Sequence, residues 1–182
     1  SIYILGSVST GGTGFQIDIF SWFMSIVFSS IGFLVAIYSI KYMDKDTGLD
    51  KYYLLLQTMV AGMIGVVYAA DLFTLFVFWE VMALSGYALV AFRKHKWEPV
   101  EAGYKYLIMS SSGSIIVLFA LSFLYGLTGT LSIQHLAASL ADSQANSLIY
   151  ISLLMIIVGF GLQAGMVPFH TWLPDAHMAA SS

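Results

Sequence analysis

The chain has 182 residues, of which 59% are hydrophobic and 9% are charged, with a formal net charge of −3. Soluble domains carry roughly 25% charged residues, so this composition is that of an integral membrane protein. The absence of cysteine excludes disulfides, cysteine-bound zinc and cysteine-bound iron–sulfur clusters within the chain, and no basic patch suggests nucleic acid. We expect no metal and no cofactor here.

Residues 1–16 are rich in Gly, Ser and Thr and have no clear apolar period. They are expected to form an extracytoplasmic lead-in, with Gly11, Gly12 and Gly14 in turns. The segment lacks the basic start of a signal peptide. Because the chain begins without Met and stops at MAASS, we expect a fragment or processed segment that is incomplete at its C-terminus.

Five apolar segments follow, each long enough to approach the roughly 20 residues that a membrane-spanning helix needs. The predicted fold is an all-α, multi-pass transmembrane helix bundle with short loops. We find no soluble domain and no sequence repeat with a period of about 20–50 residues. The last span is expected to be interrupted. The predicted spans are residues 17–40, 52–70, 72–92, 102–127 and 148–167.

Two carboxylates stand where spans begin. Asp18 lies at the entry of the first span, where a negative charge suits the positive end of the helix dipole. Asp71 lies in the tight connection before the third span and can cap that helix. Between the fourth and fifth spans, residues 133–140 form a short amphipathic candidate.

The distribution of basic residues predicts the orientation. The loops after the first and third spans, with the first turns of the fourth span, hold all seven Lys and Arg residues, and the other two connections hold none. By the positive-inside rule, these loops face the cytoplasm, the N-terminus lies outside, and the segment after the last span is cytoplasmic. The basic residues are Lys41, Lys45, Lys51, Arg93, Lys94, Lys96 and Lys105.

Glu80 is the ionisable residue deepest in a predicted span. It lies nine residues after Asp71, which places it roughly 13 Å along a helix and close to the bilayer midplane. A carboxylate there costs on the order of 3 kcal/mol to insert. It is either a protonated, hydrogen-bonded packing residue or a titrating carboxylate on an ion path, and we favour the second.

Lys105, at the cytoplasmic end of the fourth span, is one candidate partner for Glu80. The alternative is a lysine that reaches the interface and pairs with Glu101, one turn earlier. A run of small polar residues lies between Ser110 and Ser114. It favours close packing against another helix over a polar path that holds water.

The end of the fifth span is broken by glycines and by Pro168. It is either an ordinary helix end with Trp172 as an interface anchor, or an interrupted helix of the kind that exposes backbone groups to ions. Gln163 lies about one turn before Pro168 and is polar but uncharged. His170 and His177 follow; they are either solvated or able to relay protons at neutral pH, and their spacing is not that of a metal site.

Two motifs resemble a known family. ADLFTLFVFWEVMALSGYALVAF (residues 70–92) and AGMVPFHTWLPDAH (residues 164–177) are similar to signature segments of the antiporter-like proton-translocating subunits of complex I, of Mrp antiporters and of membrane-bound hydrogenases. Residues 101–132 fit the helix between them. The resemblance covers roughly residues 18–180 and implies most of the first of two inverted repeats, without its last helix.

The resemblance also assigns roles to residues. Glu80 matches the family's membrane glutamate, whose partner is a lysine on the broken helix. That lysine position falls on Gln163, so the basic half of the implied charge pair is missing here. Together with the candidates found from the residues themselves, the predicted proton path comprises Glu80, Lys105, Gln163, His170 and His177.

The leading functional prediction is therefore a subunit of a complex I-like or hydrogenase-type respiratory complex. It would move protons, or sodium ions in exchange, across the cell (inner) membrane, with the redox chemistry and its cofactors in other subunits. Its expected partners are membrane subunits and lipid. The alternatives are a non-pumping structural subunit, which Gln163 favours, and a free-standing cation/proton antiporter, which would work without a redox partner.

Overall fold

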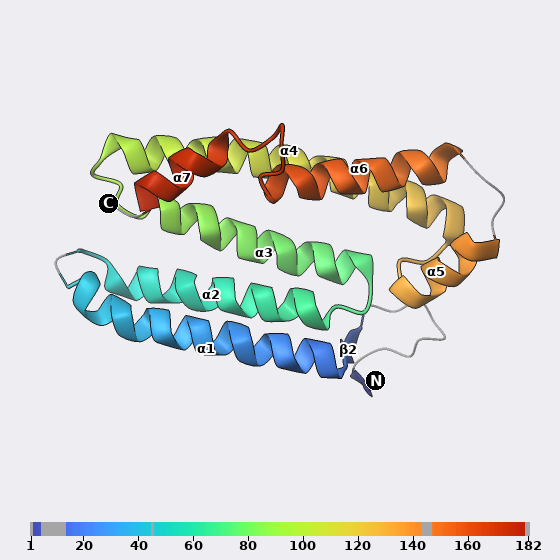
Figure 1. Cartoon of the computed structure of the whole chain (residues 1–182), viewed down its shortest axis with the longest axis horizontal. Helices are drawn as coiled ribbons and strands as arrows, with labels where there is room; N and C mark the ends of the chain where they lie inside the picture. The colour runs from blue at the N-terminus through green and yellow to red at the C-terminus, as the bar shows by residue number, and fades with distance from the viewer. Residues whose placement is uncertain (1, 5–13, 45, 143–146, 181–182) are drawn as a thin grey trace.

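The computed structural model describes residues 2–4, 14–44, 46–142 and 147–180, and these are almost entirely helical (Figure 1). Two short strands pair antiparallel beside the start of the first helix, a hairpin that the sequence did not predict. The predicted turn residues Gly11 and Gly12 lie outside the described residues. The elements are β1 (Ile2–Ile4), β2 (Phe15–Ile17), α1 (Ile19–Tyr42), α2 (Leu49–Tyr68), α3 (Leu72–Val90), α4 (Trp97–Thr128), α5 (Ile133–Asp142), α6 (Ser147–Gln163) and α7 (Trp172–Ala180).

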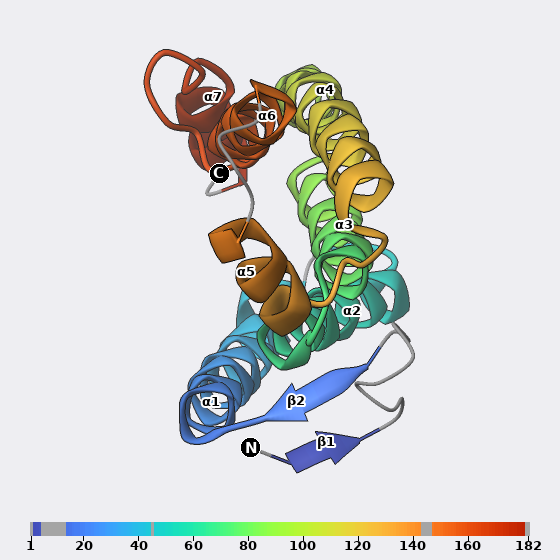
Figure 2. The same ribbon diagram turned by 90° about the vertical axis from the view of Figure 1, so that its right-hand side faces the viewer.

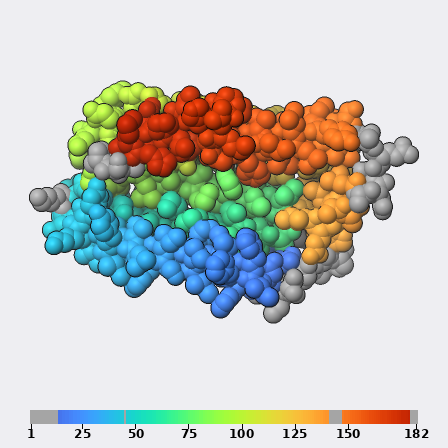
Figure 3. Space-filling view, in the orientation of Figure 1, coloured from blue at the N-terminus to red at the C-terminus, as the bar shows by residue number. Residues whose placement is uncertain are grey.

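The long helices lie side by side, and successive ones run in opposite directions (Figure 1). α1 packs on α2, α2 on α3, α3 on α4, and α4 on α6. In the end-on view, α3 lies between the α1–α2 pair and the α4–α6 pair, and α5 stands at the end where α1 and α3 begin (Figure 2). One face of the molecule is an elongated slab edged by α1 on one side and by α6 and α7 on the other (Figure 3).

Within the described residues, α1, α3 and α4 are long and apolar enough to cross a membrane, with mean hydropathies of 2.1, 1.7 and 2.1. α6 is apolar but shorter, at 17 residues. α2 runs beside α1 and α3 (Figure 1). These helices confirm the all-α, multi-pass class, while the number of five spans stays a prediction.

Several helix boundaries differ from those predicted. α4 begins at Trp97, before the expected start at 102, because Pro99 lies in its first turn, where a missing N–H breaks no helical hydrogen bond. α2 spans Leu49–Tyr68 where residues 52–70 were expected. α6 ends at Gln163, before the expected 167, and Gly165 beyond it adopts a φ of +66°, which ends a helix at little cost.

The helix cap predicted at Asp71 is confirmed, and Asp18, which was predicted as a charge suited to the helix dipole, is also a cap. Asp18 accepts a hydrogen bond from the Ser21 amide at 2.7 Å, and Asp71 accepts one from the Thr74 amide at 2.8 Å. The buried Asp71 also accepts from the Thr74 hydroxyl at 2.6 Å and from the Gly14 amide at 3.2 Å. It therefore fixes the start of α3 against the segment that leads into β2.

Small residues set the distance between α4 and α6. A Cβ atom at Gly113 would lie 2.7 Å from the carbonyl oxygen of Gly159, and one at Gly159 would lie 2.5 Å from a methyl group of Val117. Neither position has room for a side chain. The packing role predicted for residues 110–114 is confirmed at Gly113, where the two backbones approach closely.

The helical structure is interrupted between α6 and α7, as predicted for the last span. α7 resumes along α4 after eight residues of turns, which include the cis peptide bond before Pro168 (Figure 1). The Trp172 indole bridges the break: its Nε1–H donates to the carbonyl oxygen of Leu162 at 3.1 Å, and its ring stacks on Tyr106 at 4.1 Å. Because Trp172 is 5% exposed, its alternative role as an interface anchor is wrong.

Candidate functional site

Glu80 lies in the middle of α3 with its side chain half-buried. Its Oε1 atom accepts a short hydrogen bond from the Ser114 hydroxyl of α4. The same oxygen accepts from Nε2 of Gln163, at the end of α6, at 3.3 Å. The carboxylate predicted from the sequence therefore meets polar groups from two other helices.

Gln163 connects the remaining atoms of this site. Its Nε2 donates to the Ser114 hydroxyl at 2.7 Å and approaches the Ser110 carbonyl oxygen at 3.3 Å. The side chain is 9% exposed, and its Oε1 has no hydrogen-bond partner among the described residues. We call Glu80, Ser110, Ser114 and Gln163 the Glu80 cluster.

The spacing along each helix explains the cluster. Ser110 and Ser114 are four residues apart, so they share a face of α4 with Gly113, which contacts α6. On α6, Gln163 lies one turn after Gly159, the other member of that close contact. The close approach of the two backbones thus brings the amide of Gln163 within reach of the serines.

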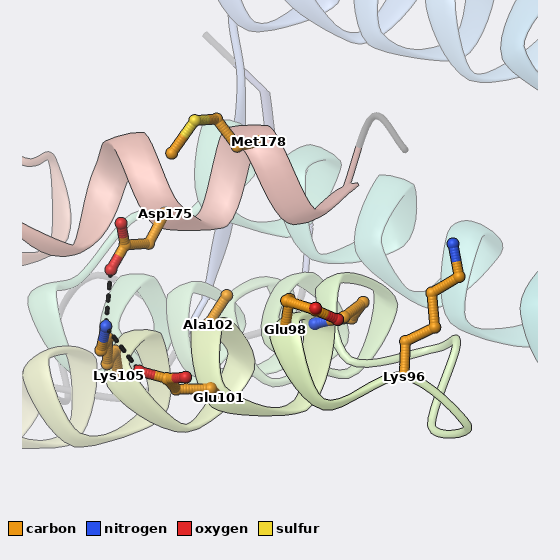
Figure 4. Close-up of a pocket in the computed structure, with 8 residues that line it drawn as sticks. Lys96, Glu98, Glu101, Ala102, Lys105, Asp175 and Met178 are labelled. Carbon is orange, nitrogen blue, oxygen red and sulfur yellow. Dashed lines mark hydrogen bonds and ion pairs between the residues drawn. The ribbon is translucent and has the colours of Figure 1, made fainter.

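Lys105 is not joined to the Glu80 cluster. Its ammonium group lies 2.9 Å from Glu101 and 2.7 Å from Asp175 of α7 (Figure 4). The pairing with Glu101 is the alternative considered from the sequence. Asp175 was not anticipated, because it lies 70 residues away in the chain.

The Lys105 ion pairs line an open cavity of about 790 Å³ between α4 and α7. Three carboxylates and two ammonium groups border it, with Met178 on the α7 side (Figure 4). Lys105 is about half exposed, so solvent screens these pairs. The cavity is lined by Lys96, Glu98, Pro99, Glu101, Ala102, Lys105, Asp175 and Met178.

The two predicted relay histidines are exposed. His170 lies in the turns between α6 and α7, and His177 lies on α7 with its Nδ1 2.8 Å from the Leu173 carbonyl oxygen. Among the described residues, no side-chain contact connects either ring to Glu80. In the same residues, no three His, Asp or Glu side chains converge as a metal site.

Of the five residues predicted for an ion path, the structure brings together Glu80 and Gln163. Sequence reasoning missed Ser114 as a hydrogen-bond donor to Glu80, since it treated the serine run as packing. The signal available was the spacing of Ser110 and Ser114 on one face of α4, together with the family position of Gln163.

The fold and the site together define a bundle of apolar helices in which a half-buried carboxylate lies beside a broken helix. Residues 69–182 match the family described as "NADH:quinone oxidoreductase/Mrp antiporter, TM", and residues 8–53 match "NADH-Ubiquinone oxidoreductase (complex I), chain 5 N-terminus". The chain belongs to the NADH:quinone oxidoreductase/Mrp antiporter family, which confirms the resemblance found in its motifs.

Individual relatives agree with this assignment. The "F(420)H(2) dehydrogenase subunit N" of Methanosarcina mazei is 34% identical over 92% of this chain and 34% of its own length. The "NADH-quinone oxidoreductase subunit N" of Heliobacterium modesticaldum is 39% identical over 90% of this chain and 34% of its own length. The present chain therefore spans about a third of the length of these curated relatives.

A solved structure extends the similarity to three dimensions. A chain of the membrane-bound sulfane sulfur reductase, described as an archaeal respiratory membrane complex, superposes with a TM-score of 0.89 and 34% sequence identity. The match covers 98% of this chain and 36% of that one. This chain thus shares the order and packing of its helices with about a third of that chain.

Proposed function

We propose that this chain is part of an antiporter-like membrane subunit of a respiratory complex, and that Glu80 carries ions through it. The observation that supports this most directly is the convergence of α3, α4 and α6 on the Glu80 carboxylate through Ser114 and Gln163. A carboxylate at that depth is costly, and its hydrogen bonds offset the cost of its charge. The ions are protons, or sodium ions in exchange for protons.

The cluster suits a carboxylate that changes its charge state. When Glu80 is ionised, the Ser114 hydroxyl and the Gln163 amide both donate to it. When it is neutral, these donors lose much of their interaction energy, since hydrogen bonds to a charged group are about twice as strong. A redox reaction in a partner subunit that shifts nearby charges would therefore move an ion on or off Glu80.

The proposed setting is the cell (inner) membrane, among other membrane subunits and lipid. α1 supports this, because it exposes an apolar face to its surroundings, with Phe20, Trp22 and Phe33 all more than half exposed. The proposed orientation has the N-terminus outside and the segment after α6 in the cytoplasm, as the basic loops indicate. In this orientation the cavity at Lys105 opens to the cytoplasm.

A non-pumping structural subunit is the second candidate. Its support is that Gln163 cannot ionise and that Lys105 is paired with Glu101 and Asp175. Among the described residues, no basic side chain forms an ion pair with Glu80. If a basic partner is essential for translocation, this part of the subunit only holds the complex together.

Ion translocation by the intact complex in sealed vesicles distinguishes the two. We expect Glu80→Gln to reduce translocation at least tenfold while the complex still assembles, because the amide cannot exchange an ion. Glu98→Gln, which removes an exposed carboxylate outside the cluster, is the matched control and should leave the rate unchanged. Normal translocation by an assembled Glu80→Gln complex would establish the structural role.

A further inference from the structure

The Ser114 hydroxyl has two acceptors within reach of its single proton. One is the Glu80 carboxylate, with which it forms a short hydrogen bond, and the other is the Ser110 carbonyl oxygen at 3.0 Å. A hydroxyl group carries one donor hydrogen, which rotates about the C–O bond, and two acceptor lone pairs. The proton of Ser114 can therefore point to Glu80 or to Ser110, and the charge of Glu80 decides which acceptor attracts it more strongly.

The backbone of α4 holds both positions of this proton in place. Ser110 and Ser114 lie four residues apart on one helix, where a serine hydroxyl can bond the carbonyl of the preceding turn. Their side chains are 2% and 8% exposed, so water does not compete for the hydroxyl. Turning the proton from one acceptor to the other requires no movement of a helix.

Gln163 is a fixed donor beside this hydroxyl. Its Nε2 faces the Ser114 hydroxyl at 2.7 Å, and the Glu80 carboxylate and Ser110 carbonyl oxygens at 3.3 Å each. Rotating the amide by half a turn would set its Oε1 against the Ser110 carbonyl, and two acceptor oxygens have no hydrogen to share. The amide therefore keeps its nitrogen toward Glu80 in both charge states.

The two charge states of Glu80 require opposite partners. An ionised carboxylate only accepts hydrogen bonds, whereas a protonated one carries an O–H that has to donate to an acceptor. An unpaired O–H in a low-dielectric site is costly. Of the two side chains that bond Glu80 in the described residues, Gln163 presents only N–H, and Ser114 alone can both donate and accept.

We propose that Ser114 is a positioning residue that holds Glu80 in both of its charge states. While Glu80 is ionised, the Ser114 hydroxyl donates to it beside the Gln163 amide. When the carboxylate binds a proton, the new O–H donates to the Ser114 oxygen, and the Ser114 proton turns to the Ser110 carbonyl. Release of the proton reverses both steps. This inference rests on the proposed function and deepens it, because it names the group that lets Glu80 exchange a proton without a basic partner.

Ion translocation in sealed vesicles and infrared difference spectroscopy of the intact complex test this role together. We expect Ser114→Ala to lower translocation at least tenfold. It should also move the band of protonated Glu80 to higher frequency, because the carboxyl O–H loses its acceptor. Ser114→Thr keeps a hydroxyl that can bond the same carbonyl and should restore most of the translocation.

Ser112→Ala is the matched control. Ser112 is exposed, and its hydroxyl donates to the Ile108 carbonyl oxygen at 2.8 Å, four residues earlier on the same helix. The substitution therefore removes the same kind of intrahelical hydrogen bond without touching Glu80. Translocation and the Glu80 band should both stay as in the wild type.

Normal translocation with an unchanged Glu80 band in an assembled Ser114→Ala complex would overturn the role of Ser114. A slow Ser114→Ala complex whose Glu80 band keeps the wild-type frequency would overturn it as well, since the hydroxyl would then affect packing only. Glu80→Gln separates these failures from failure of the proposed function. If Glu80→Gln stops translocation and Ser114→Ala does not, the role of Ser114 alone is contradicted. If Glu80→Gln translocates normally, the proposed function is contradicted too.

Discussion

Glu80 and Gln163 are 83 residues apart, yet their side chains share a hydrogen bond because one buried indole holds the broken helix in place. The Trp172 N–H ties α7 to the Leu162 carbonyl, which belongs to the residue next to Gln163. That carbonyl lies at the end of α6, where it also accepts a long hydrogen bond from the Gly165 amide at 3.4 Å. Trp172 therefore positions the amide of Gln163 without touching Glu80.

We predict that Trp172→Phe keeps the ring stacked on Tyr106 but loses the hydrogen bond to Leu162. The expected cost is about 1–2 kcal/mol of unfolding free energy, with ion translocation reduced several-fold because Gln163 is held less firmly. Chemical denaturation and vesicle assays measure the two effects. Trp97→Phe is the control, since Trp97 is 73% exposed and should change neither. Equal behaviour of the two variants would show that the indole does not position Gln163.

For single residues, the sequence predicted which side chains belong to the site better than it predicted which side chains they contact. Glu80 stands out because a lone carboxylate in an apolar span is costly, and the family motif places Gln163 opposite it. The link between Lys105 and Asp175 could not be predicted, because it depends on where α7 folds back along α4. The role of Trp172 was missed for the same reason: an aromatic residue after a span is typical of an interface.

The contact between α4 and α6 is the element-level feature on which the cluster depends. Gly113 and Gly159 allow the two backbones to touch, and Ser110, Ser114 and Gln163 lie one turn or less away from them. A wider separation would break the hydrogen bonds of Gln163 before it disturbed α3. The packing of two helices thus sets the geometry of a site on a third.

We predict that Gly113→Ala forces α4 and α6 apart, because its Cβ would lie 2.7 Å from the Gly159 carbonyl oxygen. The expected cost is about 1–3 kcal/mol, accompanied by loss of most ion translocation. Gly126→Ala on the same helix is the control: nothing lies within 4 Å of its added Cβ, so stability should stay the same or rise slightly. Thermal unfolding and translocation assays of both variants provide the measurement. Unchanged translocation in a folded Gly113→Ala protein would contradict the dependence of the site on this contact.

Helix type was predictable because apolar runs of this length have few alternatives in a membrane, and the cap at Asp71 follows from its side chain. Helix ends were less predictable. α4 begins at Trp97 since a proline is tolerated in a first turn, and α6 stops at Gln163 because Gly165 turns the chain before Pro168 is reached. The hairpin of β1 and β2 has no strong signal in so short a segment.

The whole molecule has two ends of different character. The connection between α3 and α4 carries Arg93, Lys94 and Lys96, and Arg93 forms an ion pair at 3.0 Å with Asp46, which lies between α1 and α2. The opposite end carries α5 and the start of α3 (Figure 1). A membrane that holds this bundle would separate the two ends, with the basic end on the cytoplasmic side.

We predict opposite accessibility of the two ends. The natural chain has no cysteine, so Lys94→Cys and Gln134→Cys each introduce a single thiol into this chain at an exposed position, one at each end. A membrane-impermeant thiol reagent should label Lys94→Cys only in inside-out vesicles and Gln134→Cys only in right-side-out vesicles. Labelling of both thiols from one side would contradict the bundle orientation, and the reverse pattern would invert it.

Infrared difference spectroscopy of the turning-over complex tests most directly whether Glu80 exchanges an ion. An ionised and a protonated carboxyl group absorb at different frequencies, so an exchange at Glu80 leaves a paired signal. We predict a carboxyl signal in the wild type that changes with turnover, is missing in Glu80→Gln and persists in Glu98→Gln. A signal identical in the wild type and in Glu80→Gln would mean that Glu80 keeps one charge state throughout, and would contradict its place on the ion path.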